Sequence, residues 1–163
     1  MPNTRSAKLA RWQTRLLIIS GSLLWLSGAI WLCLHYFGQV EGEFGPEVSP
    51  FEPWLMRLHG FALIPALLGV GGLLVTHIPK GWNDVPQRNI GLALCTVLGW
   101  LILSGYLLYY VGNDFARSVS SFAHWSVGLA VPMLFLWHFK RGKSAKVKAT
   151  RKPPSGRADK ISH

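Results

Sequence analysis

Cysteine is scarce in this sequence, and its placement excludes two common roles. Cys33 and Cys95 lie in different apolar segments of the chain. Their expected depths differ by roughly 15 Å at a rise of about 1.5 Å per helical residue. That separation excludes a disulfide bond between them. No Cys-x-x-Cys-His motif is present, which excludes covalent attachment of a c-type haem.

Acidic residues are also scarce, and none interrupts the long apolar runs. The 163 residues contain 7 Asp and Glu against 17 Lys and Arg, a net charge of +10. Four uncharged runs hold most of the hydrophobic residues: 16–40, 58–79, 89–113 and 118–139. Each run exceeds the roughly 20 residues that a helix needs to cross a bilayer, and none alternates like a barrel strand. The predicted fold class is all-α, an integral membrane four-helix bundle.

The basic residues predict how this bundle is oriented. Of the 17 Lys and Arg, 15 precede the first run, separate the second from the third, or follow the fourth. Only Arg57 and Arg117 fall on the other side. An excess of Lys and Arg marks the cytoplasmic side. We therefore predict an up-down-up-down bundle in a bacterial inner membrane with both termini cytoplasmic. The basic charge is expected to meet lipid headgroups and not nucleic acid.

Three regions are expected along the chain. They are a basic cytoplasmic arm at residues 1–15, a transmembrane domain at 16–140 and a basic, disordered cytoplasmic tail at 141–163. The outer loop 39–53 is broken by glycine and proline, so no helix is expected there. Its four glutamates, which we expect to steer a basic partner, are Glu41, Glu43, Glu47 and Glu52. No convincing internal repeat is found.

Four of the six histidines form a pattern. His59 and His77 in the second run are 18 residues apart, which is five helical turns, so they share a face. His124 and His138 in the fourth run are 14 apart and return to within about 40° of one direction. His59 and His124 lie near the outer ends of their helices. His77 and His138 lie near the inner ends. The second and fourth helices therefore present two pairs of histidines at matched depths.

Imidazoles on facing helices are suitable axial ligands for a haem iron. Two pairs are predicted to bind one iron each: His59 with His124, and His77 with His138. Spacings of 18 and 14 residues correspond to about 27 and 21 Å in ideal helices. We expect Pro65 and Pro132 to bend the helices enough to absorb this difference.

Small residues and a cation are expected to complete the cofactor sites. Gly60 and Gly128 follow the outer histidines closely and would permit a porphyrin to approach the backbone. Arg57 is either the partner of a haem propionate or an anchor in the headgroup region. His35, a third outer histidine, has several open roles: a substitute ligand, a propionate partner, part of a quinone or proton path, or a headgroup-level side chain.

The chain resembles the small bacterial four-helix di-haem cytochromes b, which include quinone-linked and superoxide-oxidising types. The segments Arg57-Leu58-His59-Gly60 and Ala123-His124-Trp125 carry this resemblance, which extends over roughly residues 12–140. It implies two haem b groups with bis-histidine ligation, transmembrane electron transfer, and a quinone or redox protein as partner. Two features depart from that family: the 18-residue spacing on the second helix, and His35 as the only histidine of the first.

The leading hypothesis is therefore a membrane b-type cytochrome, either an electron-transfer subunit or an oxidoreductase, with no catalytic residue assigned. One alternative is a non-redox scaffold or assembly subunit of a larger complex, which would share the topology and need no haem. Another is a transporter for a divalent metal, which histidine would suit. The lack of Asp and Glu within the runs and of a methionine cluster counts against a transporter.

Overall fold

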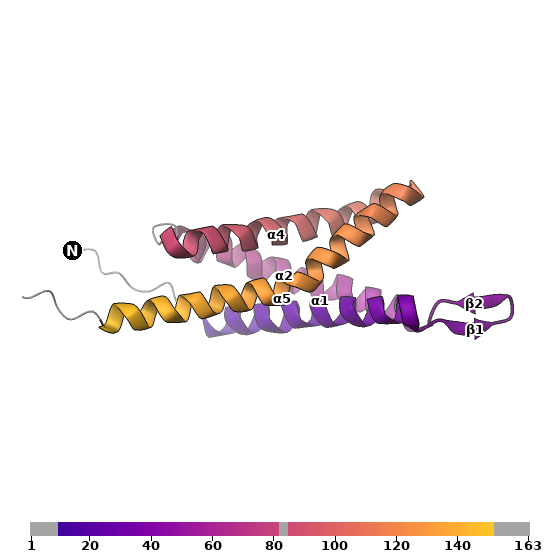
Figure 1. The fold of residues 1–163 in the computed structure, drawn as a ribbon, viewed down its shortest axis with the longest axis horizontal. Helices are drawn as coiled ribbons and strands as arrows, with labels where there is room; N and C mark the ends of the chain where they lie inside the picture. Colours follow the sequence, from indigo (N-terminus) through magenta and orange to yellow (C-terminus); the bar gives the residue numbers. More distant parts are fainter. Residues whose placement is uncertain (1–9, 82–84, 152–163) are drawn as a thin grey trace, which may run out of the picture.

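The computed structural model describes residues 10–81 and 85–151, and these are almost entirely helical. Its long helices are α1 (Arg11–Phe37), α2 (Glu52–Thr76), α4 (Val85–Tyr110) and α5 (Asp114–Arg151) (Figure 1). The shorter elements are β1 (Val40–Gly42), β2 (Gly45–Glu47) and the one-turn helix α3 (Ile78–Gly81). All four long helices are long and apolar enough to cross a membrane. The predicted four membrane-length helices are therefore confirmed.

The long helices form two units. In the first unit α1 packs along α2, and in the second α4 packs along α5. Between the units, α1 meets α5 over a short stretch. Within the described residues, no Cα atom of α2 lies within 8 Å of a Cα atom of α5. Helices in direct contact have axes about 8 to 10 Å apart, so α2 and α5 are held away from each other.

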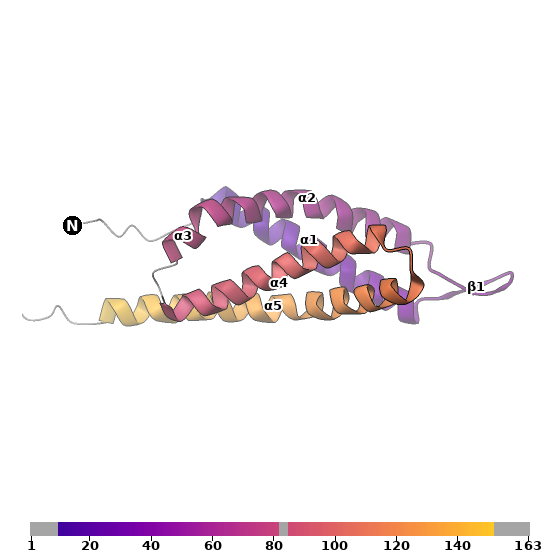
Figure 2. The same ribbon diagram turned by 90° about the horizontal axis from the view of Figure 1, so that it is seen from above.

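Both units turn at the same end of the molecule (Figures 1 and 2). There α1 continues through β1 and β2 into α2, and α4 continues through residues 111–113 into α5. Asn113 caps the N-terminus of α5. Its Oδ1 accepts a hydrogen bond of 3.0 Å from the N–H of Ala116. We call this the hairpin end, and the opposite end, where α2 and α5 finish, the tail end.

An antiparallel β-hairpin forms in the loop where no helix was expected. Val40 lies opposite Glu47, and Gly42 lies opposite Gly45. Gly45 has a φ of 121°, a conformation that glycine adopts without strain. The hairpin projects beyond the helices (Figure 1), and Phe44 at its turn is 92% exposed. The outer loop is therefore more ordered than its glycine and proline content indicates.

Two helices bend around internal prolines. Pro65 lies inside α2 and Pro132 inside α5. Proline has no N–H for the helical hydrogen bond and crowds the preceding turn, which kinks a helix. Figure 2 shows α2 bowed along its length, and Figure 1 shows α5 changing direction near its middle. The expected bends are present in both histidine-bearing helices.

The helix ends differ from the predicted regions. α1 begins at Arg11, so the predicted arm of residues 1–15 ends inside a helix. α5 extends to Arg151, so residues 142–151, which we expected to be disordered, are helical. Lysine and alanine recur in residues 142–151, and both have high helix propensity. The helix can therefore continue beyond its apolar part. Residues 1–9 of the arm and 152–163 of the tail lie outside the described residues.

Candidate functional site

The histidines of α2 and α5 meet in two pairs across the separation between the units. The ring centroids of His59 and His124 are 6.3 Å apart, and their planes form an angle of 72°. The centroids of His77 and His138 are also 6.3 Å apart, with an angle of 76°. All four rings are half-buried. These are the pairs that the sequence predicted, while iron ligation by them stays a prediction.

The separation between the paired rings fits a metal ion better than a direct hydrogen bond. A ring nitrogen lies about 1.1 Å from its centroid, so imidazoles joined by an N–H···N bond of about 2.9 Å have centroids about 5.1 Å apart. A metal–imidazole bond is about 2.0 Å long, so rings on opposite sides of one ion have centroids about 6.2 Å apart. Edge-to-face ring contacts also occur over about 4.5 to 7 Å.

The unequal histidine spacings do not prevent the match between the helices. A bowed helix spans a shorter distance between its ends than a straight helix of the same length, and α2 is bowed (Figure 2). His77 also follows the last residue of α2 as its C-cap. The 18-residue spacing on α2 lies opposite the 14-residue spacing on α5, as the two ring pairs show.

At the hairpin-end pair, a serine of the neighbouring helix contacts each imidazole. Ser27 Oγ on α1 lies 3.0 Å from His59 Nδ1. Ser104 Oγ on α4 lies 2.9 Å from His124 Nδ1. Both serines are almost completely buried, at 1% and 2% exposure. Each ring is therefore hydrogen-bonded within its own unit and contacts the histidine ring of the other unit.

The serine bonds determine which ring nitrogen carries the proton. Ser27 Oγ is only 2.6 Å from the carbonyl oxygen of Leu23, and Ser104 Oγ is 2.7 Å from that of Trp100. A carbonyl only accepts, so the single hydroxyl proton of each serine is directed to it. The serine oxygen then accepts the Nδ1–H of the histidine. In a neutral ring Nε2 carries the lone pair, on the side away from the serine.

A glycine beside each serine allows the ring to lie against the helix backbone. A Cβ atom added at Gly28 would lie 3.3 Å from Cε1 of His59. A Cβ atom added at Gly105 would lie 3.2 Å from Cε1 of His124. Both distances are shorter than an ordinary carbon–carbon contact of about 3.5 to 4.0 Å. A side chain at either position would push the ring out of place.

The glycines that the sequence predicted at the cofactor site are less closely approached. A Cβ atom at Gly60 would meet the hydroxyl of Tyr109 at 3.9 Å, and one at Gly128 would meet Leu101 at 3.8 Å. These are ordinary contact distances. The role of Gly60 and Gly128 in admitting a porphyrin stays a prediction, and Gly28 and Gly105 are the glycines that contact the histidines.

Both units contain the same serine–glycine contact to a histidine, and the spacing of the histidines did not predict it. Leu-Ser-Gly occurs at residues 26–28 of α1 and again at 103–105 of α4. In each case the serine and glycine contact the histidine of the next long helix. Serine and histidine are 32 residues apart in the first unit and 20 in the second. Because these separations differ, the repeat does not appear as a fixed period in the sequence. The repeated Leu-Ser-Gly tripeptide is the feature that could have revealed it.

The tail-end pair has different surroundings. His77 Nδ1 is buried without a hydrogen-bond partner. Within the described residues, no serine bonds to the ring of His138, and a Cβ atom at Gly91 would lie 3.9 Å from its Cε1. Leaving a buried polar atom unpaired costs about 1 to 3 kcal/mol. The tail-end pair therefore lacks, at His77, the hydrogen bond to Nδ1 that both hairpin-end rings have.

His35 and Glu52 form a separate contact at the hairpin end. His35 Nδ1 lies 3.1 Å from Glu52 Oε2, and the ring of His35 stacks on Trp31 with centroids 4.6 Å apart. Glu52 is 7% exposed, and its Oε1 has no hydrogen-bond partner. The ring of His35 is thus engaged outside the histidine pairs, which argues against the substitute-ligand role.

The acidic surface is smaller than predicted, because Glu52 belongs to α2 and is buried. Glu41, Glu43 and Glu47 remain exposed on the β-hairpin and its turn. Arg57 is also exposed, and its guanidinium lies 4.6 Å from the ring centroid of Trp54. This contact favours the anchoring role for Arg57, and a bond from Arg57 to a propionate stays a prediction.

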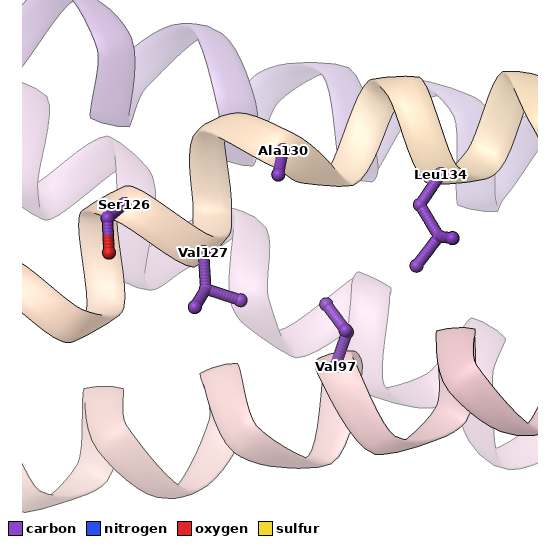
Figure 3. Close-up of a pocket in the computed structure, with 5 residues that line it drawn as sticks. All are labelled: Val97, Ser126, Val127, Ala130 and Leu134. Atoms are coloured by element: carbon purple, nitrogen blue, oxygen red, sulfur yellow. The ribbon is translucent and has the colours of Figure 1, made fainter.

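An apolar cavity of about 370 Å³ lies between α4 and α5 (Figure 3). It is lined by Val97 of α4 and by Ser126, Val127, Ala130 and Leu134 of α5. Its α5 residues lie along the helix between His124 and His138, and their side chains point towards α4 (Figure 3). No histidine lines it, so it lies beside the paired sites.

Comparison with known proteins yields no match. No protein-family model matches the chain, and neither does a curated protein nor a solved structure. Within the described residues, no group of three or more His, Cys, Asp or Glu side chains is arranged to hold a metal ion.

Proposed function

We propose that this chain is a membrane b-type cytochrome that binds two haem b groups and relays electrons across a bacterial inner membrane. The observation that carries the proposal is the occurrence of two His–His pairs, each with centroids 6.3 Å apart, between helices whose described Cα atoms nowhere come within 8 Å of each other. Such a separation is required to place a flat macrocycle between α2 and α5.

A haem suits these pairs because it needs only two ligands from the protein. The porphyrin supplies four nitrogens to the iron, and two axial imidazoles complete the coordination. When bound, such a haem exchanges single electrons and offers no open position on the iron. In this proposal His59 and His124 hold the haem at the hairpin end, and His77 and His138 hold the haem at the tail end.

The remaining residues shape the sites. Gly60 and Gly128 leave the backbone accessible to a porphyrin edge, and Arg57 is the nearest candidate cation for a propionate on α2. The 14 residues between His124 and His138 correspond to about 21 Å of helix. Two centres at that separation span most of a hydrocarbon core of about 30 Å. One electron transfer between the haems would therefore cover most of the distance across the core.

The proposal also includes an orientation and partners. The bundle is up-down-up-down with both termini cytoplasmic, which places the hairpin end in the periplasm. The lipid bilayer is one partner, and a quinone or a redox protein exchanges electrons at one face. The exposed glutamates of the β-hairpin are available to a basic redox protein. Stable binding of such a partner would make this chain a subunit of a larger complex.

Haem content is the direct test of the proposed function. We expect the purified protein to be red and to contain two b-type haems per chain in a pyridine haemochrome assay. The near-perpendicular ring planes, at 72° and 76°, predict strongly anisotropic low-spin ferric signals in electron paramagnetic resonance, because each imidazole interacts with a different iron d orbital. A colourless protein that stays colourless when expressed with excess haem would rule out the cytochrome and favour the scaffold.

The orientation has an independent test. A reporter that is active only in the periplasm is expected to be inactive when fused after His163, and active when inserted at Phe44 in the turn of the hairpin. The reason is the distribution of basic residues, with 15 of 17 on one side. A reporter that is active only in the cytoplasm provides the reciprocal control. The opposite pattern of activities would invert the bundle and exchange the two faces.

A further inference from the structure

The serines beside the hairpin-end histidines are not proposed iron ligands, but each contacts a proposed ligand. Ser27 bonds to the ring of His59, and Ser104 bonds to the ring of His124. We propose that both serines are positioning residues, which hold the histidines as Nδ1–H tautomers and direct Nε2 to the iron of the hairpin-end haem. This inference rests on the haem ligation proposed above.

Stabilising their own helices would explain only one of the two contacts that each serine makes. Serine in a helix often donates to the carbonyl one turn earlier. Ser20 does so on α1, at 2.7 Å from Leu16 O, and it is as deeply buried as Ser104. Within the described residues, no hydrogen bond joins Ser20 to a histidine. Ser27 and Ser104 add a bond to the same imidazole atom in both units, and helix formation alone does not require that repetition.

The adjacent glycines support the same role. Gly28 and Gly105 each follow the serine directly and face Cε1 of the histidine at distances where an added side chain would force the ring to shift. Serine and glycine therefore fix one edge of the ring, from Nδ1 to Cε1, against the neighbouring helix. Nε2 is the next ring atom after Cε1, and its lone pair points away from the serine. Two helices thus determine the direction in which each ligand atom points.

A hydrogen bond at Nδ1 acts on the iron through the ring. When the N–H of an imidazole donates to an acceptor, the opposite nitrogen becomes more basic. A more basic ligand stabilises ferric iron more than ferrous iron, because ferric iron carries the higher charge, and this lowers the midpoint potential. His77 Nδ1 in the tail-end pair has no partner. The serines therefore lower the potential of the hairpin-end haem alone.

Alanine at each serine tests the inference. In Ser27→Ala and Ser104→Ala we expect the potential of the hairpin-end haem to rise while that of the tail-end haem stays unchanged. Haem should also leave the hairpin-end site about 10- to 100-fold faster, the usual range for loss of such a supporting bond. Redox titration gives the potentials, and transfer to apomyoglobin gives the rate. The step that disappears in His59→Ala identifies the hairpin-end haem.

Matched variants separate positioning from folding. Ser20→Ala removes an equally buried hydroxyl of α1 and should leave both potentials at their wild-type values. Ser27→Thr and Ser104→Thr keep the hydroxyl and should restore the wild-type potential of the hairpin-end haem. The tail-end haem reports in every sample whether the bundle has formed.

Each other outcome has a distinct meaning. Wild-type protein without haem would overturn the proposed function. Two haems with unchanged potentials and release rates in both alanine variants would overturn the positioning role and leave the ligation intact. Two further outcomes would also overturn the inference. They are a potential shift in Ser20→Ala equal to those in the other alanine variants, and loss of both haems from Ser27→Ala and Ser104→Ala. Either would show that the serines support the bundle as a whole.

Discussion

His59→Ala is expected to remove one of two haems from the purified protein and to leave the other in place. The change takes away an axial iron bond, and the ring of His124 opposite cannot complete the coordination alone. His124→Ala should give the same result, because the two rings form one pair. The haem content per chain and the number of steps in a redox titration measure the effect.

The other pair provides the matched comparison. His77→Ala and His138→Ala are expected to remove the tail-end haem and to leave the hairpin-end haem bound. His35→Ala is the control, since its ring contacts Glu52 and Trp31 and should not be needed by either haem. Loss of haem in His35→Ala would show that the hairpin-end ligand was wrongly chosen. Two haems in every single variant would remove the ligation model.

Leucine at Gly28 is expected to displace His59 and to weaken haem binding at the hairpin-end site. Even a Cβ atom there would lie 3.3 Å from the ring, and leucine adds three further carbons. Overpacking of this kind costs about 1 to 3 kcal/mol. Each 1.4 kcal/mol is about a tenfold change in binding, so affinity for the hairpin-end haem should fall by roughly 5- to 150-fold. Gly105→Leu should act in the same way through His124.

Two other glycines of the same helices serve as controls. A Cβ atom at Gly21 of α1 or Gly99 of α4 would meet nothing within 4 Å. Gly21→Leu and Gly99→Leu are therefore expected to keep both haems, with spectra like those of the wild type. Haem content and absorption spectra compare the four variants. If Gly28→Leu bound two haems as tightly as Gly21→Leu, the close approach at the ring would have no bearing on the cofactor.

The sequence predicted the helices well because the membrane restricts the alternatives. An uncharged run of more than 20 residues can satisfy its backbone in lipid only as a helix or within a closed barrel, and the barrel pattern is absent. Helix ends were less predictable, since α5 continues past the apolar run to Arg151 in a segment whose propensity is also helical. The β-hairpin of residues 40–47 depends on the positive φ of Gly45 beside its turn, and the spacing of hydrophobic residues does not predict such a turn.

The histidine pairing was predictable, whereas the contacts within each unit were not. Spacing and depth place His59 opposite His124 once α2 and α5 are helices with shared faces. The partners of Nδ1 depend on the rotation of α1 against α2 and of α4 against α5, which helix periodicity does not determine. Glu52 shows the same limit, because its place in the sequence indicated an exposed loop, and packing against α1 buries it beside His35.

In the proposed cytochrome, the separation of α2 and α5 would make haem binding and assembly of the two units a single equilibrium. Lipid gives no hydrophobic drive for helices to associate, and the buried apolar residues of the described chain are only Ala62, Ala66 and Ile90. A haem ligated by one histidine from each unit would bind the docked units and not the separated ones. Each tenfold rise in free haem above the dissociation constant would then stabilise the docked form by about 1.4 kcal/mol. The haem supply of the cell would thus set how much of the chain escapes membrane proteolysis.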